Sequence, residues 1–185
     1  MSMTLNPVNE AAFQKAVQSL ETLNRAAVFH PTGTGKSCIA WKVVEAHPQT
    51  TFFWLVAGAQ RLALRQAELT RYNGGTLPGN VRFCDCEKLA AATPEQWVRL
   101  GEQKPGCIVL DCYHELSAVC WAQSVQKLLR MCPQAKVLGL GVPNGAPVCA
   151  AAQELFADCI VSHMTVAEAM AAGTMPVPSA YAALL

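Results

Sequence analysis

The feature that most constrains the fold is a glycine-rich turn at residues 30–37, which reads HPTGTGKS. An apolar run at 26–29 precedes the turn, and apolar residues recur at helical spacing over 36–46. The two glycines let backbone N–H groups converge on one point, and the helix that follows directs the positive end of its dipole there. The pattern therefore predicts a buried strand, a phosphate-binding loop and a helix, in that order.

Six residues of this loop are candidates for contact with a nucleoside triphosphate. Lys36 is placed to reach the β- and γ-phosphates, and the Ser37 hydroxyl to bind the Mg²⁺ ion that accompanies them. The full set is Thr32, Gly33, Thr34, Gly35, Lys36 and Ser37. The strict loop pattern begins with glycine, whereas this chain has His30 at that position. The strand before the loop and the helix after it support the assignment in spite of this departure.

Apolar strands alternate with amphipathic helices along the chain. The predicted strands cover residues 26–29, 51–56, 81–84, 107–110, 135–140 and 159–161. The predicted helices cover residues 10–23, 36–46 and 59–71, a segment that begins at Pro94, and residues 117–130 and 165–171. The strands are apolar throughout, which is typical of parallel strands buried on both faces. We therefore expect an α/β fold, a three-layer P-loop domain with a mostly parallel central sheet, formed by residues 1–185 as one domain.

Composition narrows the class of protein. Apolar residues make up 52% of the chain and charged residues 15%, which is enough apolar sequence for a full core and argues against disorder. The net charge of +1 favours no class of partner. The nine cysteines include no Cys-x-x-Cys pair, so we expect buried thiols in a reducing compartment rather than a zinc site. Without a signal peptide or an apolar run of the ~20 residues that a membrane span needs, a cytoplasmic protein with no membrane partner is expected.

A carboxylate that could reach a metal ion beside the phosphates is found at Asp111. It directly follows the apolar strand at 107–110, although an Asp in that place can also serve a turn. Hydrolysis needs a further group that positions or deprotonates the attacking water, and the natural place for it is the next residue. That residue is Cys112, an apolar-like thiol that cannot act as this base. The sequence therefore predicts a metal-linked Asp111 but no catalytic residue.

Together these residues resemble the first RecA-like lobe of superfamily 2 helicases, in the group of DEAD/DEAH-box proteins and type III restriction subunits. Residues 31–37 are similar to motif I of that family. Residues 111–114, DCYH, stand where motif II (Asp-Glu-x-His) belongs, and residues 138–143, LGLGVP, where motif III belongs. The resemblance spans nearly the whole chain and implies a RecA-like fold that binds ATP and Mg²⁺.

The chain departs from this family at residues that act after ATP has bound, in hydrolysis and in its coupling to movement. Cys112 replaces the motif II glutamate, and Gly141 stands among motif III positions at which the family has Ser or Thr hydroxyls. The chain ends at Leu185, before the second lobe that supplies arginine fingers in the family. An arginine finger contributes about 10³–10⁵ in rate and a general base about 10²–10⁴. The resemblance therefore implies a helicase-lobe protein that binds ATP and, alone, hydrolyses it weakly or not at all.

The resemblance also implies two further contacts. The family reads adenine with a segment upstream of motif I, where this chain has Asn9; a helix N-cap is the alternative role for this side chain. The family binds nucleic-acid backbone through loops after the second and third strands. In this chain those loops hold Gln60, Arg61, Arg65 and Lys88, for which a solvated helix face is the alternative. DNA or RNA is therefore a candidate partner, and so is a separate second helicase lobe.

Two other functions remain open. A small-molecule kinase would bring arginines onto the phosphates from a C-terminal lid, but all seven arginines lie at or before Arg130. A non-enzymatic interaction module with vestigial nucleotide binding would use the weakly charged tail, which ends in the apolar residues 182–185. Self-association through that surface and ordinary packing of the last helix are both compatible with this composition.

Overall fold

The centre of the fold is a six-stranded sheet in which every strand pairs in parallel with its neighbours. The computed structural model describes residues 3–111, 119–143 and 154–176. The strands follow the spatial order β3-β2-β4-β5-β1-β6. Their bounds are β1 (Arg25–Phe29), β2 (Phe52–Val56), β3 (Val81–Asp85), β4 (Cys107–Leu110), β5 (Lys136–Gly141) and β6 (Ile160–His163). All six predicted strands are confirmed, with ends that differ by two residues or fewer.

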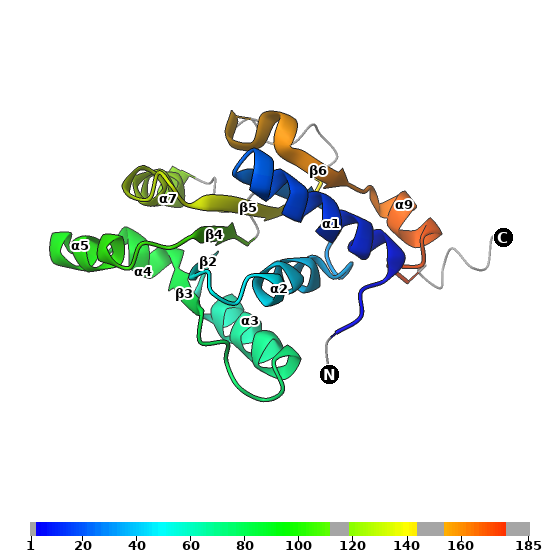
Figure 1. Ribbon diagram of the computed structural model, residues 1–185, viewed down its shortest axis with the longest axis horizontal. Coiled ribbons are helices and arrows are strands. Elements are labelled where there is room, and N and C mark those ends of the chain that lie inside the picture. Colours follow the sequence, from blue (N-terminus) through cyan, green and yellow to red (C-terminus); the bar gives the residue numbers. More distant parts are fainter. Residues whose placement is uncertain (1–2, 112–118, 144–153, 177–185) are drawn as a thin grey trace.

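Helices cover both faces of the sheet and complete the three predicted layers. Figure 1 shows α1, α2 and α3 on one side of the strands and α4, α5 and α7 on the other. The helices are α1 (Pro7–Thr22), α2 (Lys36–Ala46), α3 (Ala59–Tyr72), α4 (Cys86–Ala90), α5 (Pro94–Glu102), α7 (Val119–Met131) and α9 (Val166–Ala171), with a 3-10 turn, η1 (Ala157–Cys159), before β6. None of the helices in the described part of the chain has both the length and the apolar character of a membrane span.

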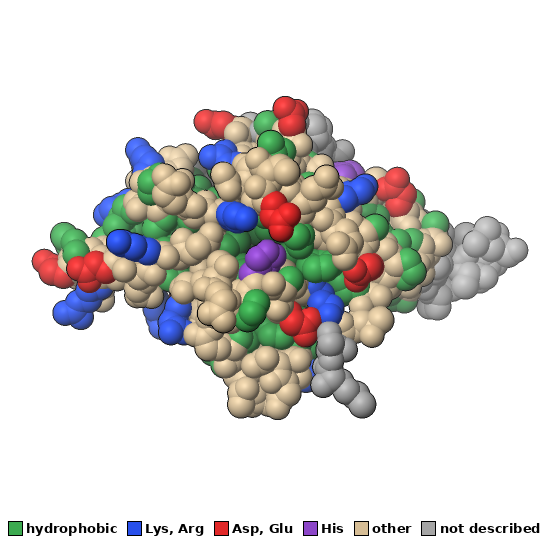
Figure 2. Space-filling model, in the orientation of Figure 1, with side chains coloured by type: hydrophobic (Ala, Val, Ile, Leu, Met, Phe, Trp, Pro, Cys, Tyr) green, Lys and Arg blue, Asp and Glu red, His purple; other side chains and the backbone are tan. Residues whose placement is uncertain are grey.

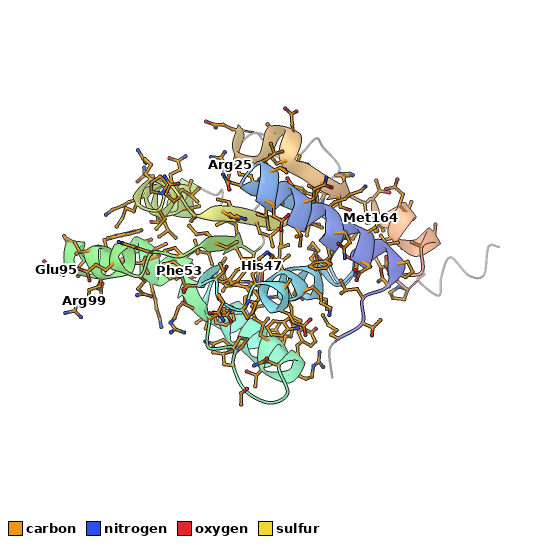
Figure 3. All side chains as sticks on the ribbon, in the orientation of Figure 1. Arg25, His47, Phe53, Glu95, Arg99 and Met164 are labelled. Atoms are coloured by element: carbon orange, nitrogen blue, oxygen red, sulfur yellow. The ribbon has the colours of Figure 1, made fainter. Side chains whose placement is uncertain are left out.

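Each strand contributes to two separate cores, which explains why the strands are apolar throughout. In β1, Ala26 and Val28 belong to the core under α1, α2 and α3, whereas Ala27 and Phe29 belong to the core under α4, α5 and α7. Successive side chains of a strand point to opposite faces, so both sets are buried. Phe53 of β2 is fully buried and lies on the α4 side of the strands (Figure 3).

Helix α1 begins at Pro7, three residues before the predicted start at Glu10. The side chain of Asn6 caps the helix, because it accepts a hydrogen bond of 2.8 Å from the backbone N–H of Asn9. Proline suits the first helical position, where a backbone N–H has no helical partner. Asn9 therefore lies inside the first turn, and its assignment as the N-cap is wrong.

Two glycines of β5 let aromatic rings pack directly against the strand. A Cβ atom on Gly139 would lie 2.5 Å from Cζ of Phe156, and one on Gly141 would overlap the ring of Phe29. Both rings are buried, at 0% and 1% exposure. Gly141 is also a position at which the resemblance implies a departure from helicase motif III. The departure has a packing reason, since the ring of Phe29 takes the space that a hydroxyl side chain would need.

Replacing Gly139 by alanine is expected to lower the free energy of unfolding by about 1–3 kcal/mol, because the added methyl group must displace the ring of Phe156. For a chain of this size each kcal/mol corresponds to a fall in Tm of roughly 2–4 °C, which circular dichroism melting curves resolve. Gly79→Ala is the matched control, because no described atom lies within 4 Å of a Cβ at that position. Equal Tm values for Gly139→Ala and the wild type would contradict the close packing.

Candidate functional site

The strands β1 and β4 bring the predicted phosphate loop and Asp111 to the same edge of the sheet. In an open parallel sheet the carboxyl ends of the strands share one edge, and ligands bind in the crevice beside it. Only β5 lies between β1 and β4. Since neighbouring strands are about 4.8 Å apart, the ends of β1 and β4 are about 10 Å apart. The loop and Asp111 therefore lie close enough to each other for both to contact one ligand.

The loop turns on two glycines in the left-handed region of backbone space. Gly33 has a φ of 85° and Gly35 a φ of 89°, which residues with a side chain rarely adopt. Between them, the Thr34 hydroxyl donates a hydrogen bond of 2.8 Å to the carbonyl of Pro31 and tightens the turn. Helix α2 begins at Lys36, so the unpaired N–H groups of its first turn lie at the loop. No described atom lies within 4 Å of a Cβ placed on Gly33, which leaves that part of the backbone open to a ligand.

Helix α1 holds the loop from behind through Asn9. The Asn9 amide nitrogen, Nδ2, donates a hydrogen bond of 2.8 Å to the carbonyl of Thr34, and the side chain is 3% exposed. A Cβ on Gly35 would lie 2.8 Å from the same nitrogen, so this contact also requires glycine. The Asn9 oxygen, Oδ1, is buried and has no hydrogen-bond partner among the described residues. The structure therefore gives Asn9 a contact with the loop backbone, while its adenine contact stays a prediction.

Lys36 lies across the loop that precedes it. Its ammonium nitrogen donates hydrogen bonds to the carbonyls of His30 and Pro31, at 2.7 and 2.8 Å. Both acceptors are neutral, whereas a phosphate oxygen carries negative charge and therefore attracts the ammonium more strongly. The ammonium is therefore placed to exchange loop carbonyls for phosphate oxygens. Ser37, which the sequence predicts to bind the Mg²⁺ ion, lies in the first turn of α2 and is half-buried.

His30 replaces the first glycine of the strict loop pattern, and its side chain is directed toward β6. Its ring nitrogen Nε2 lies 2.8 Å from the hydroxyl of Ser162, and the residue is 0% exposed. Burial, and then the nearby charges of Lys36 and His163, lower the pKa of His30 to about 4. The imidazole is therefore neutral near pH 7. Because the ring bonds to β6, the phosphate loop accommodates a histidine where glycine is usual.

Asp111 is buried at the end of β4, where donors from β2 and α3 bond to it. Its carboxylate oxygen Oδ2 accepts hydrogen bonds from the indole nitrogen of Trp54, at 3.1 Å, and from Nε of Arg65, at 2.6 Å. The same guanidinium forms a second ion pair with Glu68, one turn further along α3. Burial lowers the pKa of Arg65, but Asp111 and then Glu68 raise it by more, and the net pKa is raised. Asp111 therefore lies at the end of β4, as the sequence predicts, whereas its contacts with Trp54 and Arg65 were not foreseen.

The four predicted nucleic-acid contacts separate into two groups. Arg65 points to Asp111 and is only partly exposed. Gln60 and Arg61, at the start of α3, and Lys88 in α4 are exposed, and they follow the neighbouring strands β2 and β3. Basic and acidic side chains are interspersed on the face seen in Figure 2, with no large area of one sign. In Figure 3, Glu95 and Arg99 both project outward from α5 and illustrate this mixture.

A cavity of about 790 Å³ lies away from the loop, at the amino ends of the strands. Its walls include Leu23 at the end of α1, Arg25 at the start of β1, Leu129 of α7, and Leu155. Arg25 donates a hydrogen bond of 2.8 Å to the carbonyl of Leu155 at this cavity. None of the predicted site residues lines it. Cys112, which stands at the motif II glutamate position, lies outside the described residues, so its place relative to Asp111 stays a prediction.

The comparisons with known proteins rest on structure alone. No family model and no curated protein matches the chain. Its fold is similar to that of the UvsW helicase from bacteriophage T4, with a TM-score of 0.62 at 11% identity over 88% of this chain and 60% of that one. A hypothetical ATP-dependent RNA helicase from Sulfolobus tokodaii gives a TM-score of 0.58 at 11% identity, over 83% of this chain and 51% of that one.

A third similar structure is a SWI2/SNF2 ATPase core from Sulfolobus solfataricus, solved in complex with dsDNA. The TM-score is 0.56 at 13% identity, over 86% of this chain and 36% of that one. The chain therefore spans between about a third and three fifths of the length of these three structures. With its parallel sheet covered on both faces, the chain has the RecA-like α/β fold of helicase lobes.

Proposed function

We propose that this chain is a helicase-like lobe that binds ATP at residues 30–37. The observation that carries the proposal is the geometry of the loop, with two left-handed glycines, an open backbone at Gly33 and the start of α2 directly behind it. Converging backbone N–H groups at a helix start form a site for anions, and phosphate is the anion that such loops bind.

Lys36 supplies the charge that the backbone lacks. Its ammonium now rests on two loop carbonyls and needs only a side-chain rotation to reach the terminal phosphates. Asn9 and His30 act as positioning residues, because each fixes one side of the loop through a buried contact. A hydrogen bond to a charged group contributes about 1.5–3 kcal/mol, so loss of the ammonium should weaken binding at least tenfold.

Mg²⁺ is the metal that such a triphosphate site implies, and Ser37 and Asp111 are the residues that would hold it. Mg²⁺ would neutralise phosphate charge, as it does in other P-loop proteins. The phosphate part of the site fits its ligand, since the loop is open at Gly33. Asp111 fits the role of a Mg²⁺ ligand less well, because its Oδ2 already accepts hydrogen bonds from Trp54 and Arg65.

Weak or absent ATP hydrolysis by the chain alone is part of the proposal, because Cys112 replaces the motif II glutamate. Contact with a DNA or RNA backbone is proposed through the exposed residues Gln60, Arg61 and Lys88. The dsDNA bound to the similar SWI2/SNF2 core supports this part of the proposal. A separate second helicase lobe, or another copy of the chain, is the further partner that we propose.

Calorimetric titration with Mg-ATP tests the loop directly. The wild type should bind, and Lys36→Ala should bind at least about tenfold more weakly, because a charge-assisted contact with phosphate is lost. Lys42→Ala is the matched control, since Lys42 lies on the same helix and pairs with Glu45 at 2.6 Å. Equal heats for the wild type and Lys36→Ala would remove the basis for nucleotide binding at this loop.

Introducing a carboxylate at position 112 tests whether the missing glutamate is the reason for the slow ATP hydrolysis that we expect. Cys112→Glu should raise the rate of ATP hydrolysis at least about tenfold, toward the roughly 10²–10⁴ that a general base contributes. Cys112→Ser is the control, because it is similar in size and offers no base. Fast turnover by the unmodified chain, or no difference between the two variants, would show that the missing glutamate is not what limits hydrolysis.

A further inference from the structure

The pair formed by Arg65 and Asp111 lies where the proposed nucleotide site would need a metal ligand. Arg65 reaches Asp111 from α3, across 46 positions of sequence, with its Nε 2.6 Å from Oδ2. The Asp111 side chain is 3% exposed and the Arg65 side chain 18%, so the pair is largely shielded from water. The indole of Trp54, fully buried in β2, donates to the same oxygen.

This arrangement is costly to break. A carboxylate in a shielded pair loses much of its stabilisation when its partner leaves, because an uncompensated charge stays behind. Glu68 anchors the same guanidinium from the other side, so Arg65 is held at both ends of its planar group. A divalent cation that approaches Oδ2 must therefore displace a doubly anchored guanidinium, or accept a position close to its positive charge.

We propose that Arg65 takes the place of a divalent cation on Asp111 and thereby makes nucleotide binding by this chain nearly independent of Mg²⁺. The inference rests on the proposed nucleotide site and names the residue that sets its metal requirement. With Arg65 present, Arg65, Asp111 and Glu68 carry one net negative charge; without it, the two carboxylates carry two. Lys36 and the loop backbone then supply the charge that holds the phosphates, with or without metal.

The test compares ATP binding in excess Mg²⁺ with ATP binding in EDTA, by calorimetry on the full chain. The readout is the ratio of the two Kd values, EDTA over Mg²⁺. The wild type should give a ratio below about three, whereas Arg65→Gln should give a ratio above about ten, because the carboxylate has then lost its positively charged partner and attracts the metal that travels with the phosphates. The exposed Arg99 of α5 provides the matched control, since Arg99→Gln removes the same charge far from the loop and should leave the ratio unchanged.

A double variant locates the effect. Adding Asp111→Asn to Arg65→Gln should return the ratio to the wild-type range, because the carboxylate that recruits the metal is gone. A wild-type ratio above about ten, or equal ratios in the wild type and Arg65→Gln, would overturn the inference while leaving nucleotide binding intact. If Arg65→Gln fails to fold, the ratio of the wild type alone tests the inference: a value below about three supports it, and a value above about ten overturns it. Absence of ATP binding in both buffers would instead refute the nucleotide site itself.

Discussion

The parallel direction of all six strands is the constraint on which the rest of the structure depends. It places every loop that follows a strand at one edge of the sheet, so the loop after β1 and Asp111 after β4 lie at the same edge although they are far apart in sequence. It also buries each strand on both faces, which explains the apolar runs and the two cores. Fold and candidate site therefore have the same physical origin.

Within the fold, the phosphate loop is held by neighbouring elements as well as by its own side chains. Asn9 bonds to the backbone at Thr34, and the ring of His30 bonds to Ser162 of β6. Packing also accounts for two departures seen in the sequence, one from the strict phosphate-loop pattern and one from the pattern of motif III that the resemblance implies. His30 is accommodated because its ring lies toward β6, and Gly141 is required because the ring of Phe29 lies against it. These contacts hold the loop in the conformation on which the proposed ATP binding depends.

Local sequence patterns were enough to predict the strands, the loop and the position of Asp111. Each depends on a few adjacent residues: an apolar run, a pair of glycines, or a carboxylate at a strand end. The contacts that the sequence did not reveal join distant segments, such as Asn9 with Thr34 and Arg65 with Asp111. Arg61 and Arg65 look equivalent in sequence, so the local pattern does not reveal that Arg65 pairs with Asp111 at the end of β4. Helix α4 was missed because its five residues are too few for helical periodicity to show.

The central claim is that backbone amides of residues 33–37 converge on phosphate. It is tested most directly by recording ¹H–¹⁵N correlation spectra of the labelled chain during titration with ATP and with inorganic tripolyphosphate. Both ligands should shift the amide signals of Gly33, Gly35 and Lys36 more than those of other residues, because the phosphates alone make these contacts. Unchanged loop signals, or shifts confined to the cavity beside Leu23 and Leu155, would contradict the claim.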